Sequence, residues 1–153
     1  MARIRLLIFA AAVAAWGSAN AQPQIHIIYM GGNDCPPCRA WRARELPKLQ
    51  TTDAFRKTRF TYVDKLIGSA VPPSLFLPSE ARPYKAQLDE AGNRLVGSPQ
   101  TAVVVDGKVF DYYFGTRSAD EIETMIASIL RGSRYPFERC VKRETQRKCA
   151  VKK

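Results

Sequence analysis

The sequence predicts an α/β fold in which a central mixed sheet of about four strands is flanked by helices. Three observations support this prediction. Strand patterns at 24–30 and 60–64 enclose a helical pattern, a hairpin pattern spans 101–114, and an amphipathic helix pattern follows the hairpin. The 153 residues are enough for one domain with a hydrophobic core.

The first unit runs from residue 24 to residue 64. Residues 24–30 form a nearly continuous apolar run, as expected for a strand covered on both faces. A turn at 31–34 leads to Cys35-Pro36-Pro37-Cys38, and a helical pattern then runs to about Leu46, because Pro47 cannot continue a helix cleanly. Residues 60–64 alternate in polarity like a strand. A right-handed crossover between the two strands makes them parallel neighbours.

The middle of the chain has weaker signals. Four prolines between residues 72 and 83 argue against long regular elements, and a short helix is predicted at 84–90. This segment is a candidate for setting partner choice, and equally for plain connection.

The last third of the domain is the clearest. Strands at 101–105 and 108–114 are joined by Asp106-Gly107, a strong two-residue hairpin turn. Ser118 and Glu121 form a capping box for a helix that ends near Gly132. The apolar face of this helix comprises Ile122, Met125, Ile126, Ile129 and Leu130.

Residues 1–21 are predicted to be a cleaved signal peptide. Arg3 and Arg5 precede an apolar run, and Ala19-Asn20-Ala21 has the form of a signal-peptidase site before Gln22. The alternative is a retained membrane anchor, for which the apolar run is short. We therefore expect a periplasmic or secreted protein with a domain at 22–132 and a basic tail at 133–153.

The net charge of +10 is concentrated at the two ends of the chain. The nine Lys and Arg residues from 131 onward leave the stretch 22–130 almost neutral. A basic tail is typical of a solvated segment, or of one that contacts an acidic protein or anionic lipid. Export argues against nucleic acid as the main ligand.

The pair Cys35 and Cys38 is the candidate catalytic centre. A Cys-x-x-Cys at the start of a helix places the first cysteine at unpaired backbone N–H groups and at the positive end of the helix dipole. Both effects favour the thiolate, which is the species that attacks disulfides. We expect Cys35 to be exposed and to attack, and Cys38, one turn further in, to be more buried and to resolve.

The four cysteines form two local pairs by spacing, although three connectivities are open. For Cys140 and Cys149 we predict a structural disulfide that pins the tail. A second redox pair that relays electrons to Cys35 and Cys38 is the alternative, but no strand-to-helix context surrounds it.

The order of these elements resembles the thioredoxin superfamily over residues 24–131. The motifs that carry the resemblance are the Cys-x-x-Cys after a strand and Gly97-Ser98-Pro99 before a hairpin. The resemblance implies a thioredoxin-like fold, a cis bond before Pro99, and a Ser98–Pro99 segment that pairs with the partner backbone beside the cysteines. Pro36 and Pro37 stiffen the ring between the cysteines and complete the predicted substrate-binding residues.

The sequence departs from that family at two positions close to the cysteines. Tyr29 stands where thioredoxin has a buried acid, so deprotonation of Cys38 by such an acid is not expected here. Asp34 stands where thioredoxin has a tryptophan, and its carboxylate opposes thiolate formation unless it faces solvent or caps the helix.

The function predicted from these features is thiol–disulfide exchange on cysteine-containing exported proteins or with a membrane redox partner, with no cofactor. Copper binding by the two thiolates is one alternative, because a tetrahedral zinc site would need more ligands and His26 is the only histidine. A binding module without catalysis is the other. We expect His26 to be an ordinary strand residue.

Overall fold

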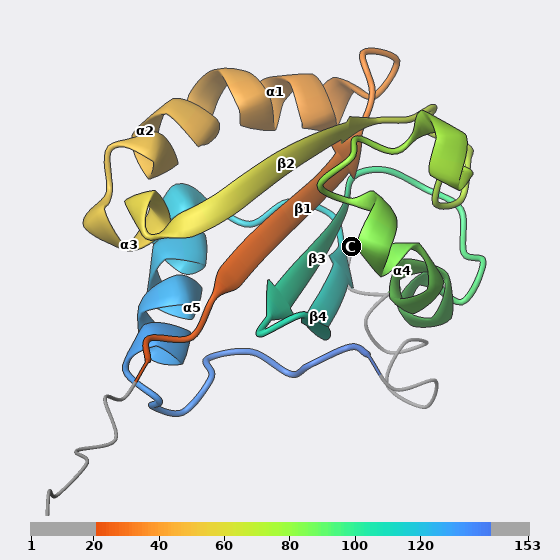
Figure 1. The fold of residues 1–153 in the computed structure, drawn as a ribbon. Coiled ribbons are helices and arrows are strands. Elements are labelled where there is room, and N and C mark those ends of the chain that lie inside the picture. Colours follow the sequence, from red (N-terminus) through yellow and green to blue (C-terminus); the bar gives the residue numbers. More distant parts are fainter. Residues whose placement is uncertain (1–20, 142–153) are drawn as a thin grey trace, which may run out of the picture.

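The structure is a computed structural model that describes residues 21–141, and Figure 1 shows its fold. The strands are β1 (Ile25–Gly31), β2 (Thr58–Asp64), β3 (Gln100–Val105) and β4 (Lys108–Phe114). The α-helices are α1 (Pro36–Arg44), α2 (Leu46–Gln50), α3 (Asp53–Arg56), α4 (Lys85–Gly92) and α5 (Ala119–Leu130). Two 3₁₀ turns, η1 (Ser74–Phe76) and η2 (Arg82–Tyr84), lie before α4.

The four strands form one mixed sheet in the order β2-β1-β3-β4, which confirms the predicted fold class. The β1 and β2 strands are parallel, as the predicted crossover requires, and the other pairs are antiparallel. Asp106 and Gly107 both adopt positive φ, as a tight hairpin between right-handed strands demands. The order of strand, Cys-x-x-Cys helix, strand, hairpin and helix is the order that the resemblance to the thioredoxin superfamily implies.

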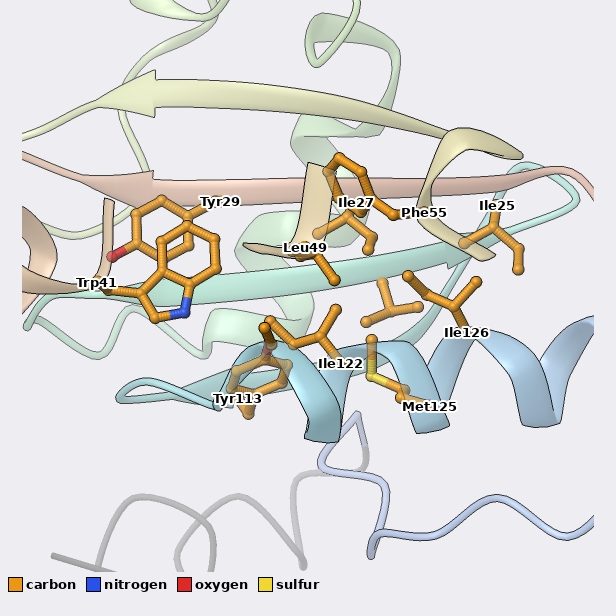
Figure 2. Packing of buried hydrophobic residues seen from close by; sticks show 12 residues of the cluster. Ile25, Ile27, Tyr29, Trp41, Leu49, Phe55, Tyr113, Ile122, Met125 and Ile126 are labelled. Carbon is orange, nitrogen blue, oxygen red and sulfur yellow. The ribbon is translucent and has the colours of Figure 1, made fainter. Parts of the chain in front are cut away.

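Helices cover both faces of the sheet, so the alternating side chains of β1 enter two cores. In Figure 1, α1, α2, α3 and α5 lie on one side and α4 on the other. Figure 2 shows the first core, where Ile25, Ile27 and Tyr29 of β1 meet Trp41 and the apolar face of α5. Ile28 and Met30 face the second core, together with Leu88 of α4.

The helix ends follow the local sequence signals. Ser118 and Glu121 form the predicted capping box of α5, and the Thr52 hydroxyl caps α3. The predicted helix after the cysteines is divided at Glu45, and Pro47 lies in the first turn of α2, where a missing N–H leaves no bond unmade. Asn93 ends α4 in the left-handed conformation.

The chain after α5 lies against β4. The carboxylate of Asp111, which is fully buried, accepts hydrogen bonds from the Tyr135 hydroxyl at 2.6 Å and from the Cys140 N–H at 3.0 Å. Arg117 lies 3.3 Å from the same carboxylate. Residues 133–141, the described part of the predicted tail, are therefore bonded to the sheet through one buried acid, while Tyr135 and Phe137 also pack against the first core.

The predicted signal peptide and the rest of the tail fall on residues 1–20 and 142–153, which lie outside the described residues. Among the described helices, none has the length and apolar character needed to cross a membrane.

Candidate functional site

Cys35 and Cys38 are joined by a disulfide at the start of α1. Cys35 is the N-cap residue of this helix, and its Sγ accepts a hydrogen bond from the N–H of Cys38 at 3.2 Å. A sulfur in this position replaces the oxygen of a usual N-cap side chain. The structure thus confirms that the first cysteine lies at a helix N-terminus, where backbone N–H groups and the helix dipole stabilise a thiolate.

The expectation that Cys35 is exposed is wrong for this disulfide-bonded form, in which both cysteines are 0% exposed. The side chain of Cys35 turns back over the first turn of α1, because its Sγ bonds both the Cys38 sulfur and the Cys38 N–H. Attack on this disulfide by a partner thiolate therefore requires the residues around it to move.

The residues that surround the pair in sequence are largely exposed. Pro36 and Pro37 occupy the first turn of α1 and face solvent. The exposed Asp34 does not cap the helix; its Oδ2 accepts a hydrogen bond from the N–H of Ile67 at 2.9 Å. Asn33 accepts a bond from Arg42 at 2.6 Å. Asp34 therefore connects the turn before the cysteines, by this hydrogen bond, to the segment that follows β2.

The bond between Ser98 and Pro99 is cis, as the resemblance implies. In the antiparallel pairing of β1 and β3, Met30 lies opposite Gln100, so one further step places Pro99 opposite Gly31. Gly31 in turn borders the disulfide, since a Cβ built there would lie 2.7 Å from Cys38 Sγ. The structure thus brings the Ser98–Pro99 segment and the cysteines together around Gly31, with Pro99 buried and Ser98 half-buried.

Tyr29 and Trp41 pack together in the first core, on the strand and the helix that carry Gly31 and Cys38. Their rings are stacked with centroids 4.4 Å apart, and Trp41 Nε1 donates to the carbonyl of Arg117 at 2.7 Å. The buried hydroxyl of Tyr29 has no hydrogen-bond partner among residues 21–141. Burial raises the pKa of Tyr29, so the phenol stays protonated and cannot act as a base toward Cys38.

Lys65 was not singled out by sequence reasoning, yet it lies between the two halves of the site. Only 5% of this residue is exposed, and its Nζ donates to the carbonyl of Gly97 at 2.6 Å and to Ser98 Oγ at 3.1 Å. Burial lowers the pKa of Lys65 to about 8, and the negative charge of Asp34 partly opposes this. The only sequence signal was a charged residue directly after a predicted strand.

Exposed large apolar side chains occur on the two segments that Lys65 joins. Leu66 and Ile67 follow Lys65 directly and are 70% and 41% exposed, and Val96 precedes Gly97 and is 63% exposed. Leu75 and Phe76 of η1 are also exposed. These are the large hydrophobic residues exposed within 21–141, so the apolar surface of this part of the chain is concentrated in segments 66–76 and 96.

His26 is an ordinary strand residue, as predicted. It is buried near the start of β1, at the end remote from the cysteines, and its Nε2 lies 2.8 Å from Thr61 Oγ1. Burial, chiefly, lowers the pKa of His26 to about 4. Within residues 21–141, no three His, Cys, Asp or Glu side chains are grouped closely enough to hold a metal ion.

The disulfide predicted between Cys140 and Cys149 stays a prediction, because Cys149 lies outside the described residues. Cys140 itself is buried, and its N–H is held by Asp111 as described above. The roles predicted for Ser98, Pro99, Pro36 and Pro37 in substrate binding likewise stay predictions.

No protein-family model matches the chain, and no curated protein matches it. Among solved structures, the chain is similar to desulfothioredoxin from Desulfovibrio vulgaris Hildenborough, solved in solution in its reduced form. The sequence identity is 23% and the TM-score is 0.45, over 69% of this chain and 81% of that chain. At this identity and score the likeness says nothing about the activity of this chain.

Proposed function

We propose that this protein is a thiol–disulfide oxidoreductase whose reactive pair is Cys35 and Cys38. The observation that carries the proposal is the position of Cys35, whose Sγ caps α1 and is disulfide-bonded to Cys38 three residues later. Hydrogen bonding and the helix dipole both stabilise the thiolate that such an enzyme needs.

The reaction consists of two exchanges of sulfur partners. In the reducing direction, the Cys35 thiolate attacks one sulfur of a partner disulfide, forms a mixed disulfide and releases the other partner sulfur as a thiolate. The Cys38 thiolate then attacks Cys35 Sγ and expels the second partner thiolate. Two electrons pass to the partner, and the Cys35–Cys38 disulfide closes. A partner dithiol drives the same steps in reverse.

The partner we propose is a protein segment with apolar residues around its cysteine. The exposed side chains of Leu66, Ile67 and Val96 lie near the site along the chain. The N–H of Ile67 is bonded to Asp34, and Val96 precedes Gly97, whose carbonyl is bonded to Lys65. A partner that covers them removes apolar surface from water, which favours association by about 25 cal/mol per Å² buried.

We further propose that these partners are exported proteins and that the protein acts in the periplasm or outside the cell. This proposal rests on the signal-peptide pattern of residues 1–21 and on the cysteine usage. The mass of the protein recovered from expressing cells tests it. A chain beginning at Gln22 supports export, and a full-length chain retained in the cytosol contradicts it.

The activity is tested by insulin reduction with dithiothreitol as the electron source. We expect the unaltered protein to accelerate the reaction, Cys35→Ser to abolish the acceleration, and Cys38→Ser to accumulate a mixed disulfide with insulin. Ser133→Ala, a change distant from the site in sequence, serves as the matched control. Full activity in Cys35→Ser would overturn the proposal, because a reactive pair that includes Cys35 would then not be needed for the reaction.

A further inference from the structure

Lys65 is the one buried Lys or Arg in the part of the chain that the structure describes. A lysine ammonium is costly to bury unless its donors are bonded. Here two of the three N–H donors are used, one on the Gly97 carbonyl at 2.6 Å and one on Ser98 Oγ at 3.1 Å. Both acceptors belong to the segment just before Pro99.

The main chain of Lys65 is fixed to the other half of the site. Its N–H donates to the carbonyl of Gly31 at 3.4 Å, which extends the pairing of β1 with β2. Its carbonyl oxygen packs against Gly32, where an added Cβ would lie only 2.3 Å away. Lys65 therefore contacts the turn before Cys35 through its backbone and the segment before Pro99 through its side chain.

The side chain of Lys65 is mostly protonated at neutral pH. Burial lowers the pKa of Lys65 to about 8, and the Asp34 carboxylate acts in the opposite direction. Most Lys65 side chains therefore keep their proton near pH 7 and can make two charge-assisted bonds, which are stronger than neutral ones.

We propose that Lys65 is a positioning residue that holds the Gly97–Ser98 backbone in register with Cys35 so that a partner chain docks beside the disulfide. The inference deepens the proposed function and rests on it. Without the ammonium, the Gly97 carbonyl still accepts a bond from Gln100 Nε2 at 2.8 Å, so the segment stays folded. What is lost is its connection to the end of β2 and, through it, to the turn before Cys35.

The test compares a substrate that needs this docking surface with one that does not. Insulin presents a peptide backbone around its disulfides, whereas DTNB is a small disulfide without one. For each protein variant, the measured quantity is the ratio of kcat/KM for insulin to kcat/KM for DTNB. We expect Lys65→Met to lower this ratio about tenfold, which corresponds to about 1.4 kcal/mol of docking free energy lost when the Gly97–Ser98 segment is no longer held in place.

Two further variants keep the test decisive. Lys65→Gln buries no charge and keeps a donor of shorter reach, so it replaces Lys65→Met if the latter does not fold, and the same fall in the ratio is expected. Lys65→Arg keeps the cation and its donors, and we expect it to recover part of the ratio. Lys108→Met is the matched control, because Lys108 is an exposed lysine in the hairpin.

Each outcome decides one proposal or both. An unaltered protein that reduces neither substrate overturns the proposed function and, with it, the role of Lys65. An active protein whose ratio is the same in Lys65→Met as in Lys108→Met overturns the role of Lys65 alone. Equal slowing with both substrates also overturns it, because the residue would then affect the disulfide chemistry rather than docking.

Discussion

Replacing Gly31 by alanine perturbs the disulfide directly. The added Cβ would lie 2.7 Å from Cys38 Sγ and 3.2 Å from both Cys38 Cβ and Tyr29 Cε1. Atoms in a packed core attract one another best at about 3.5–4.0 Å, so Cys38 or the strand must move. The neighbouring ring of Tyr29 is stacked on Trp41, which leaves it little room to yield.

The expected cost is that of adding a methyl group to a packed core, about 1–3 kcal/mol of unfolding free energy. In the oxidised protein the Cys38 sulfur is fixed by its bond to Cys35, whereas in the dithiol the side chain can rotate away from the new methyl group. The oxidised form should therefore lose more stability than the reduced form. For a two-electron couple, a difference of about 1.4 kcal/mol raises the reduction potential by about 30 mV.

Urea unfolding of the oxidised and the reduced protein, each with and without the substitution, measures both effects. Gly68→Ala is the matched control, because an added Cβ there meets nothing within 4 Å. We expect Gly68→Ala to leave the difference between the two forms unchanged. Equal losses in the oxidised and reduced forms of Gly31→Ala would contradict the expected shift in reduction potential, because the contact with a fixed Cys38 sulfur would then have no consequence.

Three other predictions follow from buried polar groups. His26 has a folded pKa of about 4, below the ordinary value of 6.5, so the stability that it contributes is present above pH 6.5 and is lost as the pH falls toward 4. Urea unfolding across this range should show the wild-type protein losing stability relative to His26→Gln, and an equal pH dependence of the two proteins would contradict this prediction. Asp111→Ala leaves Arg117 and Tyr135 without their buried carboxylate and should cost about 3–5 kcal/mol in thermal or urea unfolding, against little change in the exposed control Asp120→Ala. Tyr29→Phe removes a buried hydroxyl that lacks a partner among the described residues, so its unfolding free energy should stay within about 1 kcal/mol of wild type, and a larger loss would mean that the hydroxyl is bonded.

The predictable features were those that nearby residues determine. Asp106-Gly107 specifies a hairpin turn by its conformational preferences alone, and Ser118 with Glu121 specifies a helix start. The position of the Cys-x-x-Cys at the start of α1 followed from the apolar run before it and the helical pattern after it. The mixed sheet, with β1 and β2 parallel, could be predicted from the order of these elements along the chain.

The features that sequence reasoning missed depend on contacts between distant parts of the chain. Lys65 reads as a solvated charge after a strand, and only its bonds to Gly97 and Ser98, more than thirty residues away, explain its burial. Asp111 reads as a polar residue in an alternating strand, yet it is buried because the chain after α5 returns to it. The burial of Cys35 depends on how its side chain folds over α1, which residue spacing does not specify.

On the proposed function, the Cys35–Cys38 disulfide is a working redox pair rather than a structural one. The direct measurement is its equilibrium with a series of glutathione buffers, read by alkylation and the mass of the peptide that contains both cysteines. We predict a two-electron transition with a midpoint above about −300 mV, the range of labile and catalytic disulfides. A pair that stays fully oxidised in the most reducing glutathione buffer would instead be a structural disulfide, which contradicts the proposed function.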